Sequence, residues 1–287
     1  MIIPNKKLKS GFSMPSFGVG TWQMGGRHDH NPQNDDGADV AALRAAIDMG
    51  VTHIDTAEQY AAGYAEMPVG RAIEGFDRSK LFLISKAMPA GKGYNEYIDA
   101  CKASLQRMQT EYLDMYLLHR VPDNLKESMR AMNTLVDQGL IRHIGVANFG
   151  VESFQRAQSL TPHQIPYNQV HYNLEFREPE RTGLLKYCQE NDILLAGWRP
   201  VQKGALLKNP PQILVDMCQK YKKTSAQIAI NWLLSQEHVI TLVKTSNVEH
   251  LKENVGAIGW MMETEDIELL RHAYPNQKDV SDAVPLG

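Results

Sequence analysis

The sequence predicts a closed (β/α)8 barrel, and the order of its apolar segments carries that prediction. Short strand-like runs alternate with helix-length amphipathic runs between residues 17 and 258, giving eight pairs. Strands separated by helices imply right-handed parallel crossovers, and eight of them in a chain of this length fit a closed barrel better than an open sheet. No Gly-x-Gly-x-x-Gly turn opens a helix, as an open dinucleotide-binding sheet would require. We therefore expect residues 1–287 to form one barrel domain.

The predicted elements follow one another without a linker. Residues 7–15 alternate around Gly11 and predict a short N-terminal hairpin at most. The first barrel strand covers residues 17–22, a polar loop follows, and a helix over residues 38–49 stops at Gly50. The other predicted strands are residues 51–56, 81–88, 113–119, 143–148, 167–172, 193–201 and 239–244. The other predicted helices are residues 66–74, 94–106, 124–138, 151–159, 179–190, 210–221 extended by 225–235, and 248–258.

Composition excludes several classes of protein. The formal net charge of −3 provides no basic footprint for nucleic acid or for an anionic membrane surface. The three cysteines are far apart and lack Cys-x-x-Cys spacing, which argues against a disulfide framework or a metal site and fits a reducing cytosol. The first ten residues lack the apolar core of a signal peptide, and no run approaches the roughly 20 apolar residues of a membrane helix. A soluble, cytoplasmic protein with no nucleic-acid or membrane partner is expected.

Polar side chains end three successive predicted strands. Asp55 ends the second strand, Lys86 the third and His119 the fourth. Catalytic groups of such barrels lie at the carboxyl ends of the strands, so these three residues should converge on one mouth. Tyr60 follows Asp55 by five residues and should lie over that mouth from the next loop.

These four side chains could act together in one proton transfer. An ammonium at Lys86 would favour the phenolate of Tyr60 and lower its pKa from about 10 toward neutrality. Asp55 would keep Lys86 charged, because a buried ammonium without a partner is costly. His119 could hydrogen-bond a substrate oxygen or help to move the proton. Together they make an acid that can protonate an oxygen while a hydride arrives at its carbon.

Each residue also has a plainer explanation. A lone Asp at a strand end more often caps a helix or a loop, and a single Lys or His there is usually structural or solvated. A loop tyrosine normally packs. The chemical interpretation depends on the fact that these groups end neighbouring strands on one rim.

Several motifs, in one order and spacing over nearly the whole chain, resemble those of the aldo-keto reductases. They are Asp55-Thr56-Ala57-x-x-Tyr60, Glu66-x-x-Val69-Gly70, Ser85-Lys86, Asp114-x-Tyr116-Leu117-Leu118-His119, Gly145-Val146-x-Asn148-Phe149 and Asn168-Gln169-Val170-x-Tyr172-Asn173. The resemblance implies a (β/α)8 fold and NADP-dependent reduction of aldehydes or ketones, with Asp55, Tyr60, Lys86 and His119 as the catalytic tetrad. It also implies a monomer.

The resemblance assigns further roles. Tyr60 is similar to the family's general acid, Lys86 and Asp55 tune it, and His119 orients the carbonyl. Asn148 and Gln169 match the side chains that hold the nicotinamide carboxamide. Trp198 stands where an aromatic ring usually stacks on the nicotinamide.

The loop after the eighth strand has the features of an anion site. Asn247 is a plausible cap for a helix that begins directly after a strand end, although an ordinary capped helix would have the same pattern. The resemblance implies contacts to the adenosine 2′-phosphate and to the adenine. The residues are Lys244, Thr245 and Ser246 for the phosphate, and Glu253 and Asn254 for the adenine.

Four positions depart from the family pattern. Ala61 replaces the usual Gly after the tyrosine, and Arg120 replaces a common Trp after His119. Arg199 puts a cation beside the cofactor's pyrophosphate or beside an anionic substrate. His250 stands where many members have Arg and attracts phosphate less strongly. NADPH is the expected cofactor, and NADH use stays open.

Three functions are compatible with these residues. An NADPH-dependent carbonyl reductase accounts for the complete tetrad. A weakly catalytic NADPH-binding sensor or regulatory barrel subunit would need tight binding and slow turnover, and a Schiff-base lyase would use Lys86 as nucleophile. Arg120 and Arg199 hint at an anionic or sugar-like carbonyl substrate, although solvated rim arginines explain them equally well.

Overall fold

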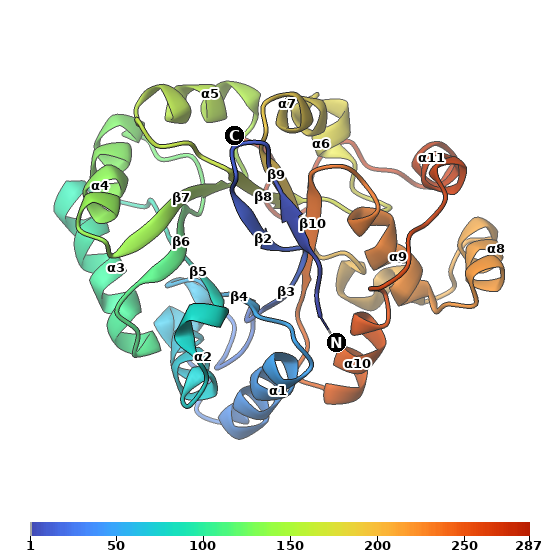
Figure 1. Ribbon diagram of the computed structural model, residues 1–287, viewed down its shortest axis with the longest axis horizontal. Helices are drawn as coiled ribbons and strands as arrows, with labels where there is room; N and C mark the ends of the chain where they lie inside the picture. Colours follow the sequence, from blue (N-terminus) through green and yellow to red (C-terminus); the bar gives the residue numbers. More distant parts are fainter. Residues whose placement is uncertain (1) are drawn as a thin grey trace.

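The computed structural model describes residues 2–287, and its core is a closed barrel of eight parallel strands. Each strand pairs with its neighbours in sequence, and β10 pairs with β3 to close the ring (Figure 1). The barrel strands are β3 (Phe17–Gly20), β4 (His53–Asp55), β5 (Phe82–Ala87), β6 (Leu113–Leu118), β7 (Ile141–Ala147), β8 (Tyr167–His171), β9 (Leu194–Trp198) and β10 (Val239–Val243). The predicted (β/α)8 barrel is confirmed.

Helices surround the barrel (Figure 1). They are α1 (Asp36–Asp48), α2 (Glu66–Ile73), α3 (Tyr94–Met108), α4 (Leu125–Asp137), α5 (Val151–Ser159), α6 (Glu178–Arg181), α7 (Leu184–Glu190), α8 (Gln212–Tyr221), α9 (Ser225–Leu234), α10 (Val248–Val255) and α11 (Thr264–Ala273). Short 3-10 turns lie at η1 (Tyr60–Gly63), η2 (Arg78–Lys80) and η3 (Gln202–Leu207). Within residues 2–287, no helix has both the length and the apolar character needed to cross a membrane.

The helix predictions were wrong in two places. The run over residues 179–190 is two helices, α6 and α7, because Gly183 takes a left-handed conformation with φ of 76°. The runs predicted over residues 210–221 and 225–235 are α8 and α9, and they are separate helices because Lys222 ends α8 in the left-handed region and Thr224 caps α9 at Gln227 N. Helix α11 was not predicted at all.

The predicted N-terminal hairpin is confirmed, and it closes one end of the barrel. Strands β1 (Asn5–Lys7) and β2 (Ser13–Pro15) pair antiparallel. Their Leu8 and Met14 belong to the same apolar cluster as the barrel-interior residues Met115, Leu117 and Tyr167. Asp192, two residues before β9, accepts hydrogen bonds from two amides of the hairpin turn. The hairpin therefore fills the amino-terminal end, which leaves the carboxyl-terminal end as the open mouth.

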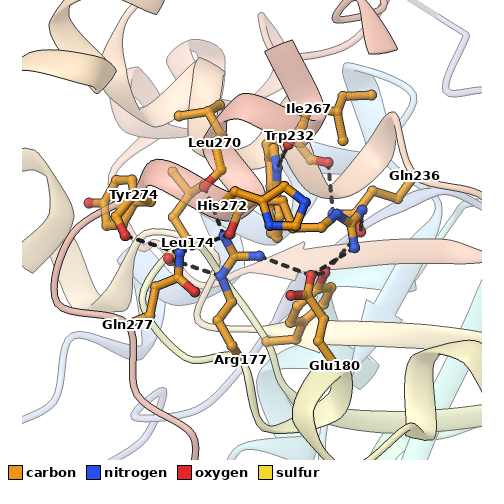
Figure 2. Close-up of polar contacts among 12 residues, drawn as sticks. Leu174, Arg177, Glu180, Trp232, Gln236, Ile267, Leu270, His272, Tyr274 and Gln277 are labelled. Carbon is orange, nitrogen blue, oxygen red and sulfur yellow. Dashed lines mark hydrogen bonds and ion pairs between the residues drawn. The ribbon is translucent and has the colours of Figure 1, made fainter. Parts of the chain in front are cut away.

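Helix α11 is held by a buried cation that no local pattern could reveal. The Arg177 guanidinium is fully buried and donates to the carbonyl oxygens of Leu270 and Arg271, at the carboxyl end of α11 (Figure 2). It also pairs with Glu180 at 2.9 Å and lies 4.3 Å from the ring centroid of Trp232. The negative end of the helix dipole and the Glu180 carboxylate together compensate the buried charge.

A fully buried histidine lies in the barrel two residues before Asp55. His53 has no hydrogen-bond partner on either ring nitrogen within the described residues. The neighbouring strand makes room for the ring at Gly18, where a Cβ atom would lie 2.4 Å from His53 Nδ1. Burial lowers the pKa of His53 from its usual 6.5 to about 4, against the attraction of Asp55. His53 is therefore neutral at pH 7.

This burial predicts that acid destabilises the fold. The folded-state pKa of His53 lies below the unfolded value, so its contribution to stability is complete above about pH 6.5 and is lost as pH falls toward 4. Between pH 7 and pH 5 the loss is about 2 kcal/mol for this one group. Urea denaturation at the two pH values measures it. His53→Leu should reduce the difference by that amount, whereas His272→Gln, at an exposed site on α11, should not. Equal pH dependence in wild type and His53→Leu would contradict the assignment.

Candidate active site

The mouth of the barrel brings the four predicted catalytic residues together. Asp55 ends β4, Lys86 is the second-last residue of β5, and His119 directly follows β6. Tyr60 begins the 3-10 turn η1, just beyond β4. Parallel pairing of β4 with β5 and of β5 with β6 puts these strand ends side by side, as the alternation of strands and helices predicted.

Lys86 is the centre of the group. Its Nζ lies 2.5 Å from Asp55 Oδ1, 2.8 Å from the carbonyl oxygen of Thr56 and 3.3 Å from the Tyr60 hydroxyl. The lysine is fully buried, which works to lower its pKa, but the Asp55 carboxylate and the Tyr60 hydroxyl outweigh burial, and the pKa is raised overall. Lys86 is thus a charged ammonium in contact with the phenol.

The expected lowering of the Tyr60 pKa was wrong in direction. Burial of the phenol raises the pKa of Tyr60 above 10, and the charges of Lys86 and Arg199 offset that rise only in part. Proximity to Lys86 was predicted correctly, but the sequence could not weigh it against desolvation. The phenol is protonated at neutral pH, which is the state required of a proton donor.

His119 is a neutral imidazole beside the tyrosine. The two rings meet edge to face with centroids 5.7 Å apart. Burial, together with the nearby charges of Lys86 and Arg120, lowers the pKa of His119 well below 6.5. Its Nδ1 atom is buried without a partner in residues 2–287, so Nε2 is the ring atom that can meet a ligand. Arg120 itself is exposed on the rim.

Two amide side chains extend the site across the barrel. Asn148 follows β7 and donates to the carbonyl oxygen of His119 at 3.1 Å, while its own Oδ1 is buried without a partner among the described residues. Gln169 on β8 donates to Asp55 Oδ2 at 2.8 Å and to the Tyr167 hydroxyl at 3.0 Å. Both amide hydrogens of Gln169 are thus used within the protein, and its side-chain carbonyl oxygen remains as an acceptor for a ligand. Acceptors of this kind fit a carboxamide such as that of nicotinamide.

Trp198 is the last residue of β9, which ends three residues before the predicted end of the strand over 193–201, and one face of its indole packs on the protein. The ring of His171 stacks on it with centroids 4.1 Å apart and planes 10° from parallel. The Arg199 guanidinium lies 4.9 Å from the indole centroid and pairs with Asp282 at 3.4 Å. Asp282 comes from the carboxyl-terminal segment, which therefore reaches the rim of the mouth.

The carboxyl-terminal segment is fastened by its backbone. The buried carboxylate of Glu178 accepts hydrogen bonds from the amides of Ser281, at 2.9 Å, and Leu286, at 3.1 Å. The Gly287 carbonyl oxygen accepts from the amide of Gly150 at 2.7 Å. One carboxylate therefore holds both ends of the stretch that contains Asp282.

The predicted anion loop lies on the adjoining side of the mouth. Lys244 Nζ donates to Ser246 Oγ at 3.0 Å, and Thr245 Oγ1 accepts from the amide of Asn247 at the same distance. Asn247 caps α10 as expected, accepting from Glu249 N and His250 N. Glu253 and Asn254 lie near the other end of α10, where Glu253 is half-buried and Asn254 is buried. The Lys244 ammonium beside a helix N-terminus fits a phosphate.

Sequence reasoning missed two residues of the mouth. Trp22 lies edge to face with Tyr60 at a centroid distance of 4.9 Å and with His28 at 5.4 Å. It is the aromatic residue at the end of the first strand-like run, a signal that was available. His171 shares its strand face with Gln169, two residues earlier, so the period-two pattern of β8 could have indicated it.

The buried ion pair predicts a large cost for removing one partner. Asp55→Asn leaves the Lys86 ammonium unpaired and should lower the free energy of unfolding by about 3–5 kcal/mol, measured by urea denaturation. Asp55→Leu combined with Lys86→Met removes both charges and should recover most of that loss. Glu190→Gln, which breaks an exposed pair with Lys186, should cost less than about 1 kcal/mol. Equal effects for Asp55→Asn and Glu190→Gln would show that the buried pair is not special.

Comparison with known proteins agrees with this arrangement. The model of the aldo/keto reductase family matches residues 16–275. The methylglyoxal reductase YeaE of Escherichia coli strain K12 is 35% identical over 271 residues, which cover 93% of this chain and 93% of that protein. The glyoxal reductase of Bacillus subtilis strain 168 is 32% identical, with 91% and 90% covered.

Solved structures give the same result. An aldo-keto reductase from Klebsiella pneumoniae, solved in complex with NADPH, is 35% identical over 98% of each chain, with a TM-score of 0.85. The family match, the curated relatives and this structure all cover the barrel and its mouth. The chain is therefore a member of the aldo/keto reductase family.

Proposed function

We propose that this enzyme reduces small aldehydes and ketoaldehydes to alcohols with NADPH, and that Tyr60 is its general acid. One observation carries the proposal: the protonated Tyr60 hydroxyl lies 3.3 Å from a buried, charged Lys86 and beside the neutral imidazole of His119. When bound, NADPH supplies the hydride that reduces the carbonyl carbon. The chain must then supply a binding place, an orientation and a proton.

The proton comes from Tyr60. As the carbonyl oxygen gains negative charge, the phenol gives it a proton and becomes a phenolate, which the Lys86 ammonium stabilises. Asp55, held by both Lys86 and Gln169, keeps the ammonium charged and in place. His119 Nε2 offers a second contact that would orient the carbonyl oxygen.

The cofactor would occupy the remaining features of the mouth. We assign Asn148 and Gln169 to the nicotinamide carboxamide, Trp198 to the face of the nicotinamide ring, and Arg199 to the pyrophosphate. Lys244, Thr245 and Ser246 would take the 2′-phosphate, with Glu253 and Asn254 near the adenine. The NADPH-bound relative supports this cofactor, and the orphaned Asn148 Oδ1 supports its placement.

The substrate class is proposed from two kinds of support. Relatives are named methylglyoxal reductase and glyoxal reductase. The Trp22 ring lies edge to face with Tyr60 and in turn contacts His28, so aromatic side chains border the proton donor, which suits a small carbonyl compound. Methylglyoxal and glyoxal are accordingly the first substrates to test.

The tetrad predicts that loss of the Tyr60 hydroxyl impairs the reduction step without weakening NADPH binding. Tyr60→Phe should lower the turnover of methylglyoxal by about 10²- to 10⁴-fold, because the proton donor is gone, while the NADPH dissociation constant stays unchanged. NADPH absorbance gives turnover, and fluorescence titration gives binding. Tyr64→Phe is the matched control, since Tyr64 lies in the same segment but is 40% exposed and stacks on His30. Undiminished turnover in Tyr60→Phe, or no NADPH oxidation by wild type with any aldehyde, would contradict the proposal.

A further inference from the structure

A buried carboxylate that takes no part in the tetrad lies beside the anion loop. Asp39, in the first turn of α1, is 3% exposed. Its Oδ1 accepts from the Ser246 hydroxyl at 2.7 Å. Its Oδ2 accepts from the Gly25 amide at 3.2 Å and from Asn34 Nδ2 at 2.8 Å. Three donors therefore stabilise a carboxylate that would otherwise be costly to bury.

Ser246 is constrained by this contact. A hydroxyl has one proton to donate, and here Asp39 receives it. The Ser246 oxygen accepts from Lys244 Nζ at 3.0 Å, so a short chain of hydrogen bonds runs from Lys244 through Ser246 to Asp39. Toward an incoming anion, Ser246 can therefore present only lone pairs, and a negative charge lies directly behind it.

We propose that Asp39 is a positioning residue that weakens the phosphate subsite of Lys244 and Ser246, so that the enzyme discriminates less between NADPH and NADH. The proposal rests on the cofactor assignment made above. A 2′-phosphate must compete with Asp39 for the Ser246 proton and is repelled by the carboxylate. The unphosphorylated ribose of NADH meets neither cost.

Asp39 also anchors the loop between β3 and α1. Through Gly25 and Asn34 it holds the segment that carries Trp22 against Tyr60, and the carbonyl oxygen of Arg27 in this segment accepts from the Ala61 amide at 3.1 Å. A variant that merely released this loop would confuse the test. The substitution has to change the charge and keep the anchor.

Asp39→Asn meets that requirement. The amide oxygen can replace Oδ2, which already accepts both loop contacts, and the amide nitrogen can replace Oδ1 and donate to Ser246 Oγ. All three contacts are kept, while the polarity toward Ser246 is reversed. The Ser246 proton becomes available to an anion, and the nearby negative charge is removed.

The test is equilibrium binding of NADPH and NADH to the purified enzyme, followed by fluorescence titration. Asp39→Asn should lower the NADPH dissociation constant about fivefold and leave that of NADH within about twofold of wild type. When Ser246 is also changed to Ala, the gain from the freed Ser246 proton should be lost, and only the gain from the removed negative charge should remain. Thermal unfolding reports whether each variant keeps the fold.

A second variant keeps the proposal testable if Asp39→Asn does not fold. Ser246→Ala alone should raise the NADPH dissociation constant less than about twofold, because that hydroxyl already donates to Asp39. A rise of fivefold or more would show that Ser246 donates to the phosphate and would overturn the inference. An unchanged NADPH-to-NADH ratio in a folded Asp39→Asn enzyme would also overturn it, and would leave the cofactor assignment intact. Failure of wild type to bind NADPH would overturn both.

Discussion

The buried ammonium of Lys86 is the constraint on which the rest of the mouth depends. A full positive charge is stable at this depth only if carboxylate and carbonyl oxygens surround it, and Asp55 and Thr56 supply them from the adjacent strand. Gln169, from the far side of the barrel, holds the second oxygen of Asp55. The phenol of Tyr60 then meets a cation that cannot move away. The Asp55–Lys86 ion pair therefore depends on the strand register. A shift of one residue in either strand would turn Asp55 or Lys86 to the other face of the sheet, away from the mouth.

The two ends of the barrel have opposite tasks, and different parts of the chain perform them. The hairpin of β1 and β2 plugs the amino-terminal end with apolar side chains, which also gives the interior a packed floor beneath Asp55 and Lys86. At the carboxyl-terminal end, loops with charged and aromatic residues take the place of packing. A rigid floor and strand-borne catalytic groups fix the tetrad, while the surrounding loops shape access to it.

The sequence predicted whatever depends on local pattern. The alternation of strands and helices gave the barrel, and strand ends gave Asp55, Lys86 and His119 as neighbours. Prediction from the sequence failed where a feature depends on contacts between distant segments. Helix α11 depends on Arg177, some ninety residues earlier, and the bond between Gln169 and Asp55 crosses the barrel. The direction of the Tyr60 pKa shift depends on the balance between burial, which raises it, and the Lys86 charge, which lowers it, and that balance is set only in the folded structure. Nothing in the sequence distinguishes Asp39 from an ordinary residue in the first turn of a helix, because its partner Ser246 is 207 positions away.

The clamp, in which the Glu178 carboxylate accepts hydrogen bonds from the amides of Ser281 and Leu286, affects how the sequence of such an enzyme can evolve. Its two hydrogen bonds grip main-chain amides, which every residue except proline provides, so the clamp places few demands on the side chains between Ser281 and Leu286. Those side chains reach the rim of the mouth through Asp282. Variation can therefore accumulate there without loosening the segment. Residues 282–285 are therefore a natural place to randomise when a new substrate preference is wanted. Substitutions there change the side chains at the rim of the mouth and leave the backbone anchoring of the segment in place.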